Sequence, residues 1–141
     1  MTARVVVADV VAGEISSADL RARAHTIADG AVVTFDGIVR DHDGGRSVVS
    51  LDYEAHPSAA STIASVAERV AERHPEVRIA VLHRVGALAL GDVALAVAVA
   101  SPHRREAFEA CSDLVDTVKA EVPIWKRQVY DDGSDEWTGS L

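Results

Sequence analysis

The chain has 141 residues, of which 48% are apolar, and its formal net charge at pH 7 is −8. This length predicts a single domain, 1–141, with one hydrophobic core, and no apolar run is long enough to predict a membrane-spanning helix. The acidic balance disfavours nucleic acid and acidic membranes as partners, because both require an extended basic surface.

Apolar periodicity and turn residues divide the chain into alternating strands and helices. In chain order they predict a strand at 4–11, a helix at 16–28, strands at 31–39 and 47–54, a helix at 57–73, strands at 77–83 and 93–100, a helix at 101–120 and a strand at 125–130. The first strand begins too early for a signal peptide, so a cytoplasmic location is expected. The acidic tail, 131–141, is predicted to be loose.

This element order predicts an α+β fold with a mixed β-sheet and helices packed on it. Asp and Gly residues between 41 and 46 predict a turn or mobile loop, which would join the strands on either side into a hairpin. The segment 93–100 alternates branched side chains with alanine, so both faces of this strand are predicted to be buried from solvent. It is therefore predicted to be central, with its alanine face closely covered by a helix or by another subunit.

Metal and nucleotide chemistry lack their usual signatures. Cys111 is the only cysteine, which excludes an internal disulfide and a multi-cysteine zinc site, and its place in an apolar helical stripe predicts burial. The six histidines are scattered without a metal-binding spacing, and there is no glycine-rich phosphate loop. We therefore expect no bound metal and no permanently bound cofactor.

The segment Val118–Lys126 is the most informative part of the sequence. Lys119 closes a predicted helix and Lys126 opens a predicted strand, and Pro123 forces a turn between them. Lys119 lies about 20° from Phe108 in helical projection, on the flank of the apolar stripe. It is either a snorkelling lysine that favours the helix C-terminus, or a partly desolvated lysine that acts as a base or nucleophile.

Other cations lie at chain positions that suit anion binding. His103 and Arg104 begin the last helix, where free backbone N–H groups bind anions, although an exposed basic first turn is the alternative. They lie about 22 Å from Lys119 along one helix, so only a symmetric dimer would bring them together. Arg40 ends a strand beside the glycine-rich loop, where it is either a phosphate or carboxylate ligand or a solvated arginine. Trp125 is either a core anchor or the wall of a pocket for a flat heterocycle.

Several segments, in order through most of the chain, resemble the catalytic (large) subunit of molybdopterin synthase. They are Phe35–Arg40, Leu51–Ala55, His83–Gly86, Gly91–Asp92, Ser101–Phe108 and Lys119–Lys126. The resemblance implies an α/β-hammerhead fold and a homodimer. It also implies that each chain binds a small ubiquitin-like sulfur-carrier subunit, which gives a heterotetramer.

The chemistry implied by the resemblance is sulfur transfer in molybdenum cofactor biosynthesis. The carrier's thiocarboxylated Gly-Gly end enters a pocket of the large subunit, and two sulfurs pass to cyclic pyranopterin monophosphate to form the dithiolene of molybdopterin. The sulfur arrives on the carrier, so the family needs no metal for this step.

The resemblance also assigns roles to individual residues. Lys119 and Lys126 match the catalytic lysines. The substrate-binding positions match Ile38, Val39, Arg40, His103, Arg104, Arg127 and Gln128, with His103 and Arg104 from the neighbouring subunit, and Phe35 and Trp125 are candidate pocket walls. Gln128 departs from the family, which usually has glutamate there. Two alternatives stay open: a catalytically silent dimer that binds the carrier, and an unrelated enzyme that forms a Schiff base on Lys119.

Overall fold

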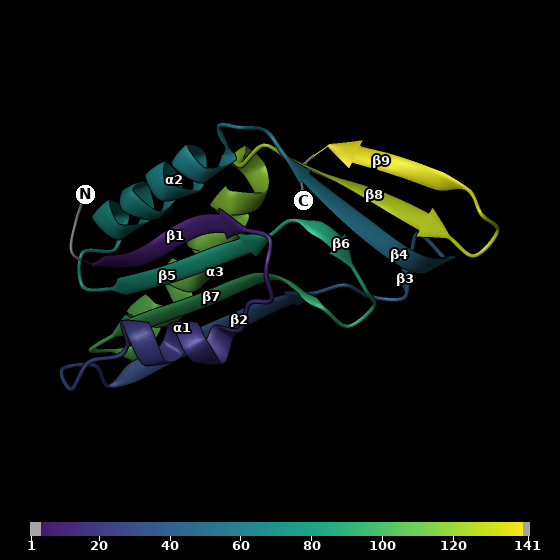
Figure 1. Cartoon of the computed structure of the whole chain (residues 1–141). Coiled ribbons are helices and arrows are strands. Elements are labelled where there is room, and N and C mark those ends of the chain that lie inside the picture. The colour runs from purple at the N-terminus through teal and green to yellow at the C-terminus, as the bar shows by residue number, and fades with distance from the viewer. Residues whose placement is uncertain (1–3, 140–141) are drawn as a thin grey trace.

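A computed structural model of the chain describes residues 4–139, which form three helices and nine strands (Figure 1). The elements are β1 (Val5–Val11), α1 (Ser17–Ala24), β2 (Ala31–Ile38), β3 (His42–Asp43), β4 (Arg46–Ala55), α2 (Ala59–Arg73), β5 (Arg78–Arg84), β6 (Gly86–Leu88), β7 (Val93–Ser101), α3 (Arg104–Glu121), β8 (Ile124–Tyr130) and β9 (Asp135–Gly139). They form two sheets, and the predicted α+β class is confirmed.

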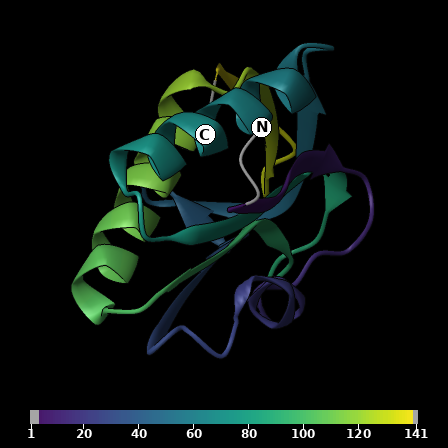
Figure 2. The same ribbon diagram turned by 90° about the vertical axis from the view of Figure 1, so that its left-hand side faces the viewer.

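The first sheet has the strand order β1-β5-β7-β2 and carries the main core. β1 is parallel to β5, whereas β5 and β2 are antiparallel to β7, so the sheet is mixed as predicted. Figure 2 shows the sheet between α1 on one side and the α2 and α3 pair on the other. Leu95, Val97 and Val99 of β7 pack in the core cluster that also contains the buried faces of α2 and α3.

The alanine face of β7 is covered by α1, which confirms the prediction for this strand. Ala96, Ala98 and Ala100 form a second buried cluster with Leu20 and Ala24 of α1. The alanines let the helix lie close to β7, because each of them adds only a methyl group to that face of the strand. At the start of α1, the Ser17 hydroxyl donates a hydrogen bond of 2.7 Å to the Asp36 carboxylate of β2.

The second sheet projects from one end of the first and contains β3, β4, β8 and β9, with β6 paired to β4 (Figure 1). The prediction of a loose tail is wrong for Asp135–Gly139, which pairs with β8 along its whole length. Trp137 and Thr138 favour a strand, and the turn before them contains Gly133 at φ 84°. This pairing covers an edge of β8 that would otherwise be open. The last two residues of the predicted tail lie outside the described residues.

The predicted hairpin between 31–39 and 47–54 is also wrong. β2 pairs with β7 and β4 pairs with β8, so the chain crosses from one sheet to the other after Ile38. Gly44 and Gly45, with φ of 56° and 80°, instead close a short hairpin between β3 and β4. Such positive φ values at both central residues suit a tight hairpin turn.

The first and last helices differ in detail from the predictions. α1 ends at Ala24 and not at residue 28, because the Asp29 carboxylate accepts hydrogen bonds of 2.7 and 2.9 Å from the Thr26 N–H and hydroxyl and holds a separate turn. In α3, Cys111 is buried as predicted. Phe108, which was expected in the buried stripe, is 61% exposed because it lies beside the face that packs on the sheet.

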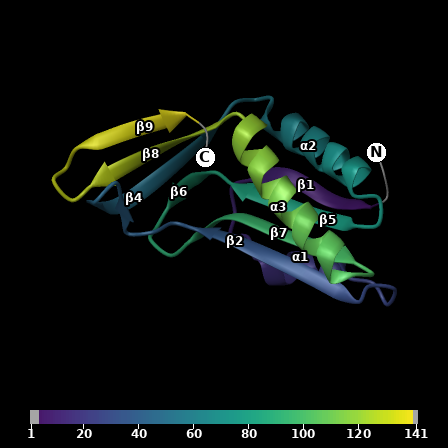
Figure 3. The same ribbon diagram turned by 180° about the vertical axis from the view of Figure 1, so that it is seen from behind.

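Ion pairs join α2 to α3, which lies across the back of the sheet (Figure 3). Arg69 pairs with Glu121, and Arg73 makes two hydrogen bonds of 2.9 and 3.0 Å with Asp113. The side chains of His74 and Thr117 also bond the Asp113 carboxylate. The Arg73 bonds, followed by those of His74 and Thr117, lower the pKa of Asp113 to about 2.

Replacement of Asp113 by Asn should therefore destabilise the protein in a pH-dependent manner. The folded pKa lies below the ordinary value of 3.8, so the carboxylate stabilises the fold above that value and ceases to do so as pH falls toward 2. We expect Asp113→Asn to cost about 1–2 kcal/mol at pH 7, with the deficit vanishing near pH 2, in urea unfolding experiments. The exposed Glu72→Gln on α2 is the control, and an equal deficit at both pH values would contradict the prediction.

Candidate active site

A cavity of about 300 Å³ lies where the two sheets meet at the C-terminal end of α3. Both sheets and the last turn of α3 contribute to its wall. Seven of the residues predicted to form a site line it: Phe35, Ile38, Val39, Arg40, Lys119, Lys126 and Gln128. Segments that lie far apart in the sequence therefore meet in one place.

The two lysines reach this cavity from two successive elements. Lys119 lies in the last turn of α3, and Val122 ends the helix in an extended conformation, φ −73° and ψ 122°. Pro123 follows and accepts a hydrogen bond from the His56 N–H, which fixes the turn against the end of β4. Lys126 then lies on β8 directly opposite Tyr53 of β4. These two are the only lysines in the sequence, and both line the cavity.

The end of β2 forms the opposite wall of the cavity. The pairing of β2 with β7 shifts register between Gly37 and Ile38, and this irregularity precedes Arg40. A Cβ atom at Gly37 would lie 3.3 Å from the Phe35 ring and 3.4 Å from the Leu95 Cβ atom, so the backbone here is closely packed. The Arg40 guanidinium is 68% exposed and lies 3.6 Å from the Asp43 carboxylate, which places it at the rim.

The charge of the cavity is opposite to that of the whole chain. Arg40, Lys119 and Lys126 are the charged residues in its lining, and among the described residues no acidic side chain lines it. The net charge of the chain is −8. A cationic recess in an acidic molecule concentrates an anionic ligand at one point, because the remaining surface repels it.

Sequence reasoning missed six lining residues: Gly37, Leu51, Tyr53, His83, Ala94 and Leu95. The Tyr53 and His83 rings meet edge to face, with centroids 4.9 Å apart. His83 is 1% exposed and its Nδ1–H donates to the Arg84 carbonyl oxygen at 2.8 Å. Burial lowers the pKa of His83 to about 4, so the imidazole is neutral. The strand alternation that places Ile79 and Val81 in the core would have placed His83 on the same face.

Two predicted residues lie on the opposite face of the second sheet. Trp125 is 39% exposed and is not among the residues that line the cavity, so the structure does not bring it into this site. The Arg127 guanidinium donates to the Asp135 carboxylate at 2.6 Å on that same face. Side chains at 125 and 127 point away from those at 126 and 128 because alternate strand residues face opposite sides.

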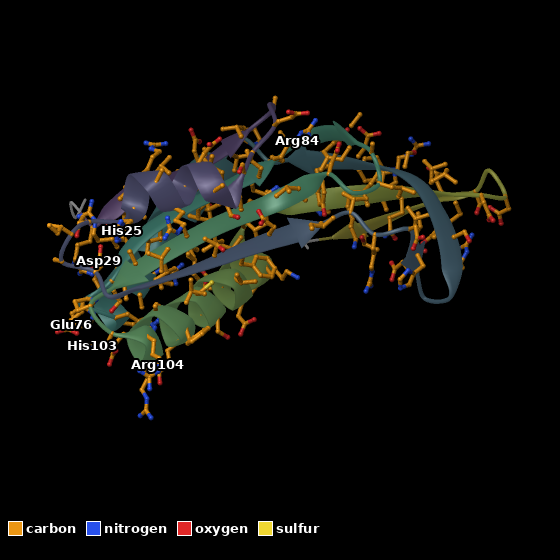
Figure 4. All side chains as sticks on the ribbon, turned by 90° about the horizontal axis from the view of Figure 1, so that it is seen from below. His25, Asp29, Glu76, Arg84, His103 and Arg104 are labelled. Carbon is orange, nitrogen blue, oxygen red and sulfur yellow. The ribbon has the colours of Figure 1, made fainter. Side chains whose placement is uncertain are left out.

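His103 and Arg104 lie at the far end of α3, as Figure 4 shows from below. They line a separate hollow with Pro102 and Phe108. The helix that separates them from Lys119 spans Arg104–Glu121, so one chain does not bring them to the cavity. Residues 4–139 contain no group of three or more His, Cys, Asp or Glu side chains that would hold a metal. Within the same residues, no helix is long and apolar enough to cross a membrane.

The fold and the cavity define an α+β protein with a cationic cavity between its two sheets, and comparison with known proteins gives the family. The model of the MoaE protein family matches residues 10–121. The chain belongs to the MoaE family, and this places it in molybdenum cofactor biosynthesis as a molybdopterin synthase catalytic subunit.

Individual relatives agree with the family assignment. A molybdopterin synthase catalytic subunit from Nostoc sp. is 40% identical over 125 residues, which cover 87% of this chain and 76% of the relative. The crystal structure of molybdopterin synthase from Staphylococcus aureus has a TM-score of 0.87 and 31% identity over 99% of both chains. This likeness confirms the predicted α/β-hammerhead fold.

A third similarity concerns the fold alone. It is to a complex of subunits 1 and 2 of molybdopterin-converting factor from Helicobacter pylori. The TM-score is 0.72 at 18% identity, and the match covers 92% of this chain and 88% of that one.

The neutral state of His83 leads to a prediction about acid stability. The folded pKa of about 4 is below the ordinary value of 6.5, so the unfolded chain binds the extra proton between these values. We expect His83 to cost stability progressively as pH falls from 6.5 to 4, by up to about 3 kcal/mol. The ring signals of His83 in NMR spectra should stay constant from pH 8 to 5. A His83 titration near pH 6.5 would contradict this.

Proposed function

We propose that the chain is a sulfurtransferase that acts on cyclic pyranopterin monophosphate. It takes sulfur from the thiocarboxylated Gly-Gly end of a small ubiquitin-like carrier subunit and forms the dithiolene of molybdopterin. The observation that carries this proposal is the cavity in which Arg40, Lys119 and Lys126 meet without an acidic residue in the lining. No resident metal or cofactor is required, because the carrier brings the sulfur, and the predicted cytoplasmic location is retained.

The chemistry of the two reactants supports this assignment. A thiocarboxylate and a phosphate are both anions, and each gains charge-assisted hydrogen bonds from ammonium or guanidinium groups. A Gly-Gly end has no side chains, so it suits a recess of only about 300 Å³. Lys119 is the proposed catalytic lysine, Lys126 binds the carrier end beside it, and Arg40 at the rim binds the substrate phosphate.

A homodimer would complete this site. Phe108 is 61% exposed and lines a groove of about 310 Å³ with Val33, Cys111 and Val115, which is the kind of apolar surface that a second copy covers. The same phenylalanine borders the hollow that contains His103 and Arg104. Dimerisation on this face would carry His103 and Arg104 toward the partner's cavity, and two carriers would then give a heterotetramer.

The two alternatives, a catalytically silent dimer that binds the carrier and an enzyme that forms a Schiff base on Lys119, have less support. The departure at Gln128 is the feature that suggested a silent module, yet both lysines and Arg40 still line the cavity. Nothing in the site indicates a carbonyl substrate. Product formation from thiocarboxylated carrier and precursor separates an active catalyst from a catalytically silent dimer, and borohydride trapping of a carbonyl substrate on Lys119 would revive the Schiff-base enzyme.

Replacement of Lys119 tests its proposed catalytic role. With thiocarboxylated carrier and precursor, the wild-type chain should form molybdopterin, detected by mass spectrometry. Lys119→Ala should lower the rate at least about a hundredfold, because removal of an acid–base or charge-stabilising group has effects of this size. The unfolding midpoint should stay close to that of the wild type. Arg23→Ala on the exposed side of α1 is the matched control, and unchanged turnover by Lys119→Ala would refute the role of Lys119.

A mixture of two inactive variants tests whether two subunits share a site. Lys119→Ala and Arg104→Ala chains should each be almost inactive alone. After they are mixed, unfolded and refolded together, half of the dimers are hybrids, and each hybrid contains one intact site. Activity should therefore recover to about a quarter of the wild-type value. Recovery should not occur if Phe108→Asp, which charges the proposed interface, is present in both chains. If the refolded mixture forms dimers but regains no activity, Arg104 acts within its own chain or not at all.

A further inference from the structure

Tyr53 lines the cavity, and neither the sequence patterns nor the family resemblance assigns it a role. It lies on β4, where its direct cross-strand partners are Lys126 of β8 and Gly86 of β6. Directly paired residues project from the same face of a sheet, so Tyr53 and Lys126 approach the cavity side by side. On the other flank, Gly86 has no side chain to cover the tyrosine.

The aromatic ring of Tyr53 lies between the two sheets and is held by both. It packs against the main core cluster and against the smaller cluster that contains Leu51. From the first sheet, the His83 ring meets it edge to face, with centroids 4.9 Å apart and planes at 80°. This is a preferred arrangement of two rings, and it fixes the direction in which the Tyr53 hydroxyl points.

His83 supports the tyrosine by packing and not by a hydrogen bond. It is 1% exposed, and its Nδ1–H donates to the Arg84 carbonyl oxygen at 2.8 Å, which anchors the imidazole to β5. Among residues 4–139, no group makes a hydrogen bond with its Nε2 atom. A tyrosine–histidine pair that transfers a proton would need the Tyr53 hydroxyl at that atom, so the two side chains do not form such a pair.

The Tyr53 hydroxyl makes no hydrogen bond with any group of residues 4–139, and it is not one of the polar atoms that are sealed from solvent. The other tyrosine differs, because the Tyr130 hydroxyl lies 3.2 Å from the Gln128 side chain and 3.1 Å from the Glu136 carboxylate. A partly buried tyrosine hydroxyl ordinarily has a hydrogen-bond partner. The partner of the Tyr53 hydroxyl therefore comes from the contents of the cavity.

Tyr53 offers the cavity a neutral donor. Burial raises the pKa of Tyr53, so its hydroxyl keeps the proton at neutral pH. An anionic oxygen that pairs with the Lys126 ammonium still has lone pairs, and a hydroxyl donates to one of them without adding charge. The ammonium lies at the end of a flexible chain, whereas the hydroxyl is attached to a fixed ring. Lys126 thus supplies charge, and Tyr53 supplies direction.

We propose that Tyr53 is a binding residue whose hydroxyl donates a hydrogen bond to an anionic oxygen of the ligand beside Lys126, and that His83 is the positioning residue that fixes the tyrosine ring. The inference rests on the proposed function, since it concerns the same cavity. Two sources share this chemistry, the C-terminal carboxyl group of the carrier and the phosphate of the substrate.

The test compares dissociation constants for two probes, measured by calorimetry. The first is the carrier with its unmodified Gly-Gly carboxylate, and the second is cyclic pyranopterin monophosphate. Tyr53→Phe removes the hydroxyl and keeps the ring, so it should weaken one probe about tenfold, and the weakened probe identifies the source of the oxygen. The unfolding midpoint should not fall, because the hydroxyl has no partner in residues 4–139 to lose.

Ser50→Ala is the matched control, because it removes a hydroxyl from the exposed opposite face of β4. It should leave both dissociation constants unchanged. Wild-type affinity of Tyr53→Phe for both probes would overturn the proposal.

NMR spectroscopy observes the hydroxyl directly, because the chain has only two tyrosines. A ¹³C label at the tyrosine Cζ atoms gives two signals, and Tyr53→Phe identifies one of them by its loss. The probe that calorimetry selects should move the Tyr53 signal, since the Cζ shift responds to hydrogen bonding at the attached oxygen. The Tyr130 signal should move less, because Tyr130 does not line the cavity. A Tyr53 signal that stays in place at saturation would overturn the proposal.

The role of His83 is tested by a double-mutant cycle. His83→Leu removes the edge-to-face contact and should weaken the selected probe about threefold to tenfold, whereas His83→Phe keeps a ring and should retain most of the affinity. In a Tyr53→Phe background, His83→Leu should have no further effect. A persistent effect there would overturn the positioning role. In the wild type, nuclear Overhauser contacts between the two rings should remain when the probe is bound, and their loss would also overturn it.

Failure of this inference is distinguishable from failure of the proposed function. If the wild type makes product but Tyr53→Phe binds both probes normally, only the inference fails. If the wild type neither makes product nor binds the two probes, the proposed function fails, and inorganic phosphate still tests the hydroxyl. The Tyr53 Cζ signal should then move with phosphate, and a signal that does not move would overturn the inference.

Discussion

The turn at Val122–Pro123 is the constraint on which the site depends. Proline cannot continue α3, and Val122 adopts an extended conformation, so the chain leaves the helix and enters β8 within three residues. The last helical turn and the first half of the strand thus face the same recess. Two lysines that are seven positions apart in the sequence become two walls of one cavity. A longer connection would leave their separation free to vary.

The two sheets have different tasks. The first, buried between three helices, supplies stability through branched side chains on one face of β7 and alanines on the other. The second is thinner and more exposed, and it holds functional side chains on alternate positions of β4 and β8. Strand alternation assigns Lys126 and Gln128 to the cavity and Trp125 and Arg127 to the other face. The lining of the cavity therefore depends on strand register, because a slip of one residue would exchange the two sets of side chains.

Much of this arrangement follows from local sequence. The strands and helices of the first sheet have strong periodicity. The alanine alternation in 93–100 correctly indicated a closely covered face, and of the two predicted covers, a helix or another subunit, the structure shows the helix α1. Three features did not follow. The pairing of β2 with β7, and not with its neighbour in sequence, is a long-range choice that local patterns do not encode. The strand at Asp135–Gly139 carries too many acids to look like one, and it exists because β8 offers an open edge. Phe108 fitted the apolar stripe predicted for α3, yet its side chain is exposed because it lies beside the face of the helix that packs on the sheet.

The restriction of lysine to the cavity has a chemical consequence. Every other permanent side-chain cation of the chain is arginine, whose guanidinium stays protonated and does not attack acyl groups. Activated acyl compounds that approach this protein therefore meet side-chain amines at one place only. Lysine modification by amine-selective reagents therefore reports occupancy of the cavity, because both lysines line it.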